Sequence, residues 1–528
     1  MRGVLVAVAV AAWAAHASAS IASLREAEEA LSAWDVPRAA ELAERLVASH
    51  PDEPRLLHLL GRVRHHQGRY AEAAELFRKV GDEERARLAS DTHEITKNHQ
   101  RQESEHFVFL HPPGKDEILA PWALETLEAA WERIGDLLGI KPEGEKIRVE
   151  VVQSAEELAK VSTLSLEAIR TTGTIAVCKF DKLMITSPKA LLRGYDWRDT
   201  LAHEYIHLLV TRKSRNHTPI WLHEGIAKFM ETAWRGPPGL ALHAASQSLL
   251  RDAVEENRLI SFEAMHPSIA LLPTAEDAAL AFAEVFTAIE FLHAKDETSV
   301  SRLLVELASG KSDREAVGAV FGKPFPLFEA EWRRHLQRRD YPEVVASVEE
   351  AHPRFRDADD PADAEERDPT ELSEFRSIAN AEARRAAHLG ELLRARGKLA
   401  AAAAKYERAV ELVGARYASL SNKYAATLLA LEETDRAIEV LEASLAAYPD
   451  HALTNLNMAR AQMQKGNASR ARPFLESSLS VNPFDPELFH RLLAVAREDG
   501  DEVLASRSRR AIELLGGRPP AEPTGGIP

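Results

Sequence analysis

The chain has 528 residues, too many for one hydrophobic core, so two to four domains are expected. Hydrophobic residues make up 45% and charged residues 28%, which is typical of a folded globular protein, and the few aromatic residues and many alanines and leucines favour helix. The net charge of −16 would repel a phosphate backbone, so nucleic acid is not an expected partner.

The first 19 residues have the pattern of a secretory signal peptide. Arg2 precedes an apolar run from Val4 to Ala15, and small residues at positions 15, 17 and 19 form an A-x-A cleavage site. We therefore expect residues 1–19 to be removed and the mature protein to be soluble outside the cytoplasm. The alternative is an uncleaved membrane anchor, for which the apolar run is short. A membrane is a partner only in that case.

Residues 20–90 are predicted to form helical repeats. The sequence A-A-E-L at residues 39–42 returns at residues 73–76, a shift of 34 positions. This period is typical of tetratricopeptide helix pairs.

The central part of the chain begins with short β-branched runs. They start at Phe107, Ile147, Thr174 and Lys182, and their alternation predicts strands. After Pro188 the pattern is helical to about residue 339, so we expect strands followed by helices in an α+β domain. An acidic, proline-containing segment at 343–375 is interpreted as a solvated tether.

The C-terminal third, residues 376–517, repeats more clearly. The residues at 437, 444, 445 and 449 recur 34 positions later as Ala471, Ser478, Leu479 and Pro483. This pattern predicts a tetratricopeptide array, with a generic alanine-rich bundle as the alternative. The tail at 518–528 is expected to be disordered.

One helical segment carries a candidate metal site. Residues 200–210 read T-L-A-H-E-Y-I-H-L-L-V, which places His203 and His207 four positions apart on one helix face. Two imidazoles so placed can reach one Zn²⁺ at about 2.0 to 2.1 Å. Glu204 would lie beside them, free to polarise water. By composition alone, a chain of this size would contain on the order of 0.1 H-E-x-x-H motifs by chance. The motif is therefore modest evidence by itself, and a third ligand is needed.

A second motif supplies that ligand. It reads P-I-W-L-H-E-G-I-A-K-F-M-E from Pro219, with Thr218 expected as the N-cap and Glu224 in the second turn. A short loop would bring Glu224 to face the two histidines. Glu231, two turns further on, is a candidate acceptor for the outer N–H of a ligating histidine.

Together the two motifs resemble the gluzincin metallopeptidases, and residues 102–342 resemble the bacterial peptidase-MA-like domain that often accompanies tetratricopeptide repeats. The resemblance implies one Zn²⁺ per chain held by His203, His207 and Glu224, with Glu204 as general base and acid. It also implies a periplasmic or secreted bacterial protein. Metzincins are excluded, because their extended motif would need glycine at 210 and histidine at 213.

The chain departs from the family at one position. Relatives often have a tyrosine in a helix that reads A-Y-A-x-x-x-S, whereas this chain has Phe282 in A-F-A-E-V-F-T. Tyr195 or His293 are the substitutes considered for the missing oxyanion donor. Loss of such a donor costs about 10²- to 10³-fold in rate.

Other notable side chains are interpreted as structural. His217 and His223 are expected at the surface rather than as alternative ligands, Trp221 in packing, and Cys178 as a small buried hydrophobe. The helical spacing of one further set predicts core positions rather than a substrate pocket: Phe282, Phe286, Ile289 and Leu292.

The predicted fold is mostly α, with an α+β zincin-like peptidase domain between N-terminal and C-terminal tetratricopeptide-like repeats. The predicted function is an exported zinc metallopeptidase, endopeptidase or aminopeptidase-like, whose repeats bind a protein substrate or partner. The alternative is an interaction or assembly scaffold with a catalytically weak or inactive peptidase-like domain, which Phe282 motivates.

Overall fold

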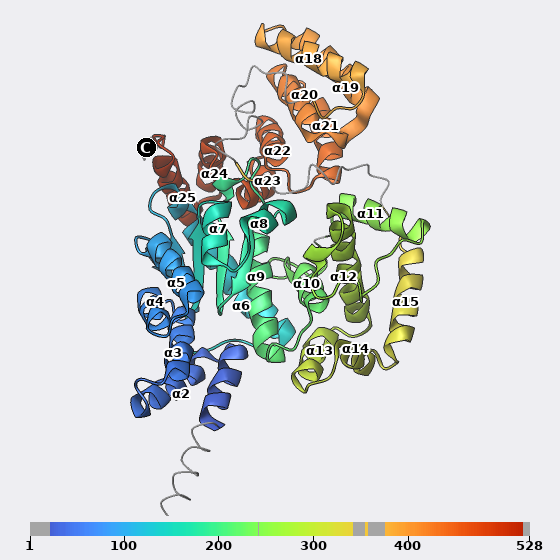
Figure 1. Cartoon of the computed structure of the whole chain (residues 1–528). Helices are drawn as coiled ribbons and strands as arrows, with labels where there is room; N and C mark the ends of the chain where they lie inside the picture. The colour runs from blue at the N-terminus through green and yellow to red at the C-terminus, as the bar shows by residue number, and fades with distance from the viewer. Residues whose placement is uncertain (1–21, 241, 342–353, 357–374, 521–528) are drawn as a thin grey trace, which may run out of the picture.

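The computed structural model describes residues 22–520 except 241, 342–353 and 357–374. The predicted signal peptide, most of the acidic segment and the end of the tail therefore lie outside the described residues. The predicted fold class is confirmed: a mostly helical chain has a small sheet in its middle and helical repeats at both ends (Figure 1). Among the described residues, no helix combines the length and hydrophobicity that a bilayer span requires.

The N-terminal repeats are pairs of short amphipathic helices. A helix at 22–32 is followed by α2 (Val36–Ser49), α3 (Pro54–His66), α4 (Tyr70–Lys79) and α5 (Glu83–Thr96). The starts of α2 and α4 lie 34 positions apart, as the repeat predicted. Gly61 allows α3 to approach α4, because an added methyl group would come within 2.9 Å of the Phe77 ring.

A five-stranded mixed sheet forms the base of the middle domain. Its order is β1 (Gln100–Glu103), β2 (Phe107–His111), β3 (Ile147–Val152), β5 (Lys182–Thr186) and β4 (Ala176–Lys179). The inner strands β2, β3 and β5 are parallel, and β1 and β4 are antiparallel edges. The sequence analysis missed β1, because Q-R-Q-E lacks apolar alternation.

Helices alternate with the strands, so the expectation of strands followed only later by helices was wrong. The interleaved helices are α6 (Ala120–Leu138), α7 (Ala155–Val161) and α8 (Leu166–Thr172). The parallel pairing explains them, since a strand can return parallel to its neighbour only through a crossover segment.

The rest of the middle domain is helical, as predicted, and ends near residue 337. Its helices are α9 (Trp197–Ser214), α10 (Ile220–Met230), α11 (Ala244–Glu255), α12 (Ala275–Lys295), α13 (Ser299–Ala308), α14 (Asp313–Phe321) and α15 (Phe325–Gln337). Helix α9 packs on α6 and on the strands β4 and β5, and α10 lies between α9 and α12.

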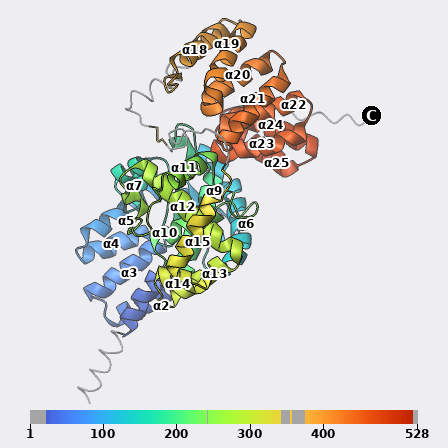
Figure 2. The same cartoon turned by 90° about the vertical axis from the view of Figure 1, so that its right-hand side faces the viewer.

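The C-terminal array comprises α18 (Ala381–Ala395), α19 (Leu399–Val413), α20 (Ala418–Ala430), α21 (Thr434–Ala447), α22 (Ala452–Gln464), α23 (Ala468–Val481), α24 (Pro486–Asp499) and α25 (Glu502–Leu514). Helices α20, α22 and α24 begin 34 positions apart, at 418, 452 and 486. Figure 2 shows the array against one end of the middle domain.

The array is docked on the middle domain rather than held by a free tether. The Trp197 indole N–H donates to the Leu479 carbonyl at 3.0 Å, and the Tyr195 N–H donates to the Val481 carbonyl at 3.3 Å. Side chains of both regions share one hydrophobic core. The tether interpretation also fails for the described linker residues 354–356, because the Arg356 N–H donates to the Ala190 carbonyl.

A buried ionic cluster joins the N-terminal repeats to the sheet. The Lys182 Nζ lies 2.8 Å from the Glu150 carboxylate on the neighbouring strand, and both side chains are fully buried. The Tyr70 hydroxyl of α4 donates to the same carboxylate and accepts from Lys182 at 2.7 Å. Burial raises the pKa of Glu150, but the charges of Lys182 and Arg148 outweigh it and lower that pKa to about 2.

Replacing Lys182 with methionine should therefore destabilise the protein by about 3 to 5 kcal/mol, because Glu150 stays buried without the cation that is itself fully buried. Urea denaturation followed by circular dichroism measures this loss. The matched control is Lys79→Met, which removes an exposed pair with Asp52 and should cost less than about 1 kcal/mol. Equal losses in the two variants would refute a stabilising role for the cluster.

Candidate metal centre

Helix α9 carries the two histidines on one face. The Asp196 side chain caps this helix by accepting the Asp199 N–H at 3.1 Å. His203 and His207 follow in the second and third turns, with ring centroids 4.7 Å apart. The helix is buried against α6 and the sheet, so both imidazoles are held in fixed positions.

A tight reversal at residues 215–219 leads into α10. Arg215 and Asn216 have left-handed backbone conformations, which turn the chain back toward α9. Helix α10 begins at Ile220 with Pro219 as N-cap, so the prediction of Thr218 as N-cap was wrong by one residue. Pro219 has an extended ψ of 157°, which excludes it from the first turn. Glu224 still falls in the second turn.

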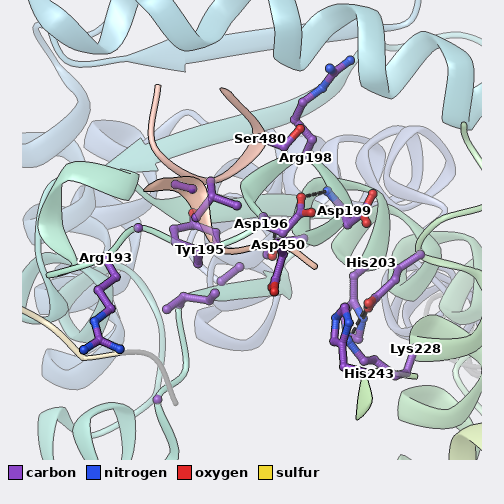
Figure 3. Close-up of a pocket in the computed structure, with 18 of the residues that line it drawn as sticks. Arg193, Tyr195, Asp196, Arg198, Asp199, His203, Lys228, His243, Asp450 and Ser480 are labelled. Atoms are coloured by element: carbon purple, nitrogen blue, oxygen red, sulfur yellow. Dashed lines mark hydrogen bonds and ion pairs between the residues drawn. The ribbon is translucent and has the colours of Figure 1, made fainter. Parts of the chain in front are cut away.

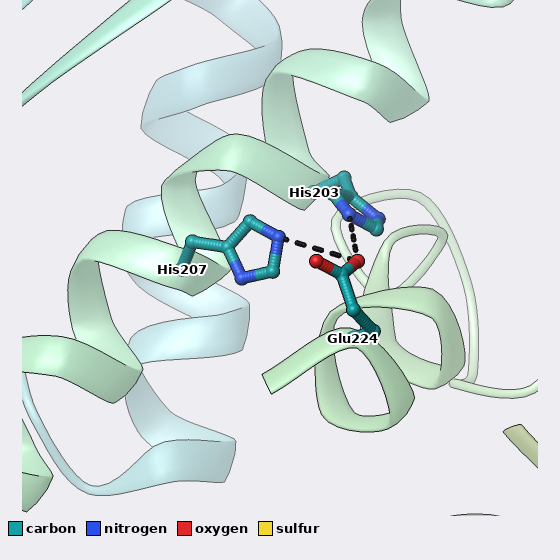
Figure 4. Close-up of side chains that lie close together, drawn as sticks. All are labelled: His203, His207 and Glu224. Atoms are coloured by element: carbon teal, nitrogen blue, oxygen red, sulfur yellow. Dashed lines mark ion pairs between the residues drawn. The ribbon is translucent and has the colours of Figure 1, made fainter. Parts of the chain in front are cut away.

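The structure brings three predicted ligands together (Figure 4). Glu224 Oε2 lies 3.5 Å from His203 Nε2 and 3.7 Å from His207 Nε2, and one ligand atom from each residue falls within 4.8 Å of the others. Donors bonded to one tetrahedral ion at about 2.0 to 2.2 Å stand roughly 3.5 Å apart. The donor set therefore fits a single divalent metal ion.

Glu231 orients one of the two imidazoles. Its Oε2 accepts a hydrogen bond from His203 Nδ1 at 2.9 Å, and its Oε1 accepts from Lys228 at 2.5 Å. Because a carboxylate can only accept, Nδ1 carries a proton, which leaves Nε2 of His203, on the side of Glu224, as the nitrogen that can bind a metal ion in exchange for its own proton. This is the position that the sequence analysis expected for Glu231.

His223 orients the other imidazole, and the sequence analysis missed this role. Its Nδ1 lies 3.2 Å from His207 Nδ1, so one ring donates to the other. The expectation of a surface position was wrong for His223, which is buried, and right for His217, which is exposed. Helix α10 packs between α9 and α12, so few of its residues reach the surface. The many apolar residues around position 223 were the sequence signal that could have indicated the burial of His223.

Glu204 lies beside the three ligands without joining them. Its side chain is buried, and the backbone N–H of Cys178 in the edge strand β4 donates to its carboxylate. The Arg212 guanidinium of α9 donates two hydrogen bonds to Asp181 in the β4–β5 turn, at 3.0 and 2.8 Å. These bonds hold the edge strand β4 close to the Glu204 carboxylate.

Family models match three parts of the chain. Residues 133–338 match the Peptidase MA superfamily, residues 24–83 and 388–452 match one tetratricopeptide repeat family, and residues 428–496 match another. A peptidase MA superfamily domain therefore lies between two regions of tetratricopeptide repeats. No curated protein is significantly similar to the chain.

The similar solved structures have low sequence identity to this chain. The APC/C hetero-tetramer Cut9-Hcn1 is 15% identical over 94% of this chain and 79% of its own, with a TM-score of 0.28. Yeast Tom70 is 12% identical over 92% and 91%, with a TM-score of 0.20. The MamA RS-1 ArsTM double mutant is 16% identical over 29% and 78%, with a TM-score of 0.23. Scores this low support no conclusion about function.

The metal centre of the peptidase MA domain opens into a cavity of about 2740 Å³ (Figure 3). Phe282 is only partly buried and lines this cavity, so its prediction as a core residue was wrong, whereas Phe286, Ile289 and Leu292 are buried as predicted. Cys178 also lines the cavity and is partly exposed, contrary to expectation. Trp221 is fully buried and donates to Asp313 at 2.8 Å.

The two substitutes considered for the missing tyrosine are engaged elsewhere. Tyr195 lines the cavity, but its hydroxyl donates to the Thr186 carbonyl. His293 packs against the Phe229 ring, with centroids 5.2 Å apart, and is not among the residues that line the cavity.

In the metal-free protein, several side chains at this site have strongly shifted pKa values. Burial lowers the pKa of His203, but hydrogen bonds to Glu224 and Glu231 outweigh it and raise that pKa to about 10. Burial lowers the pKa of His207 to about 3. Burial raises the pKa of Glu204 to about 7, although the His203 charge opposes this. A carboxyl that titrates near neutrality suits a general base.

The metal-free protein should therefore keep His203 doubly protonated up to about pH 10, while His207 stays neutral above about pH 4. A histidine whose pKa is raised on folding stabilises the fold fully at pH values below its pKa in the unfolded chain, which is near 6.5. This stabilisation is lost as the pH rises through 10, the pKa in the folded protein. Histidine NMR titration, assigned with His203→Gln, measures both values. Glu231→Gln should lower the His203 pKa, and an unchanged value would contradict the assignment.

Proposed function

We propose that the peptidase MA domain is a zinc-dependent peptidase in which His203, His207 and Glu224 hold one Zn²⁺. The observation that carries the proposal is the convergence of three ligand atoms beside a fourth residue, Glu204, that is buried and left free of them. Two neutral imidazoles and one carboxylate match the ligand set of catalytic zinc sites, which keep one coordination position open.

Zinc in this site would act as a Lewis acid toward a peptide carbonyl and would acidify water. Glu204 takes the proton from the attacking water and later delivers it to the leaving amine. In the metal-free protein the pKa of Glu204 is about 7, so this carboxyl can both take up and release a proton near neutral pH. Glu231 and His223 engage the Nδ1 atoms of His203 and His207, so Nε2 of each ring is the atom left for the metal ion.

The remaining parts of the proposal concern location and partners. The signal-peptide pattern of residues 1–19 supports export to the periplasm or medium of a bacterium. The tetratricopeptide regions support binding of a protein substrate or partner. The second candidate function is a scaffold with a weak or inactive peptidase domain, which Phe282 favours because it offers no hydroxyl to a developing oxyanion.

Protein purified without added metal should contain about one zinc per chain by elemental analysis. Glu204→Gln should keep that zinc and lose turnover of a quenched peptide library, because only the proton carrier is removed. The matched control Glu284→Gln replaces another buried glutamate outside the ligand set and should keep both zinc and turnover. Absence of zinc, or full turnover in Glu204→Gln, would refute the peptidase. Zinc without cleavage of any peptide would favour the scaffold.

Phe282→Tyr tests whether a missing donor limits catalysis. If the added hydroxyl reaches the developing oxyanion, kcat should rise by up to about 10²-fold with little change in KM. The control Phe286→Tyr adds a hydroxyl one turn away in the core and should not raise kcat. A rate unchanged by Phe282→Tyr would show that another group already serves as donor.

A further inference from the structure

The cavity in front of the metal centre has two walls from different parts of the chain. The peptidase MA domain forms one wall, which includes His203 and Glu224, and the C-terminal array forms the other from α20 to α25. Figure 3 shows Asp450 and Ser480 of the array in the same close-up as His203. Its volume of about 2740 Å³ exceeds the roughly 300 to 1,000 Å³ of small-molecule sites. The size therefore suits a polypeptide segment.

Exposed apolar side chains stand on both walls. Ile220 and Leu240 belong to the peptidase MA domain, and Leu453 and Val503 belong to the array. Large hydrophobic side chains left in solvent within a cavity indicate a surface that contacts apolar groups of a ligand. A segment bound here would place apolar residues against both walls at once.

Three arginines that line the cavity have no acidic partner among the described residues. Arg193, Arg354 and Arg416 are exposed and form no ion pair within the part of the chain that the structure describes. The Leu192 N–H donates to the Arg354 carbonyl, so Arg354 lies beside the segment that carries Arg193, and the Tyr448 hydroxyl of the array donates to the Arg416 carbonyl at 2.6 Å. We call these three side chains the arginine rim.

Other arginines of the same cavity are already neutralised. Arg235 pairs with Asp199, Arg472 with Glu476 and Asp501, and Arg507 with Glu125. Figure 3 shows Asp450 between Arg193 and His203. The rim therefore keeps an excess of positive charge that calls for anionic groups on a ligand.

We propose that this cavity binds an extended polypeptide segment whose acidic side chains contact the arginine rim and whose apolar side chains contact both walls. The inference deepens the proposed function, because the bound segment would be the substrate presented to the metal centre. The C-terminal array would thus select the substrate directly rather than act as a remote arm.

Peptide binding to the full-length Glu204→Gln variant tests the charge preference without turnover. The probes are fluorescein-labelled peptides that share the same leucines and carry four glutamates, four glutamines or four lysines. Fluorescence anisotropy should show the acidic peptide binding about ten-fold tighter than the neutral one, a preference that added salt weakens. Replacing the arginine rim with serines should abolish it. The control replaces Arg55, Arg87 and Arg518, which are exposed, unpaired in the described chain and outside the cavity.

A second pair of variants tests the array wall. Leu453→Ser should weaken all leucine-containing peptides several-fold, whereas Leu389→Ser, equally 42% exposed but outside the cavity, should not. No binding of any probe, tighter binding of the lysine peptide, or equal effects of the rim and control variants would overturn the inference. These results are independent of zinc content and turnover, so failure here is distinguishable from failure of the proposed peptidase.

Discussion

The close approach of α10 to its neighbours is the constraint on which the metal centre depends. Gly225 faces α12, and an added methyl group would come within 2.9 Å of the Val285 carbonyl oxygen. Trp221, one turn earlier, anchors the same helix through its bond to Asp313. Because Glu224 precedes Gly225 directly, this packing decides where its carboxylate lies relative to the two imidazoles. A larger residue at 225 would displace the third ligand.

Charge balance is the second constraint on the centre. Glu224 and Glu231 lie on either side of His203, and burial makes their negative charges costly unless a cation compensates them. In the metal-free protein the extra proton of His203 and the ammonium of Lys228 provide that compensation. A divalent ion can replace the proton, so metal binding and proton release are coupled. The hydrogen bonds on the outer nitrogens would remain unchanged by this exchange.

The docking of the C-terminal array changes what the repeats can do. Contacts from Trp197 and Tyr195 to the end of α23 place the array next to α9, the helix that carries His203 and His207. One large cavity results, with a ligand set in one wall and repeat helices in the other. The N-terminal repeats, by contrast, are joined to the sheet of the domain through the buried Glu150 cluster. The two repeat regions therefore contact different elements of the peptidase MA domain, the C-terminal array at the start of α9 and the N-terminal repeats at the sheet.

Local spacing in the sequence was enough to predict the repeats and the convergence of His203, His207 and Glu224. His203 and His207 share a helix face because of the helical period alone, and the 34-residue recurrence determines where the repeat helices begin. Tertiary structure decided the rest. The partial exposure of Phe282 in the cavity and the pairing of the polar strand β1 depend on which elements pack together. Such contacts join residues far apart in the chain, so no local pattern records them, and the cavity itself exists only because the array docks on α9.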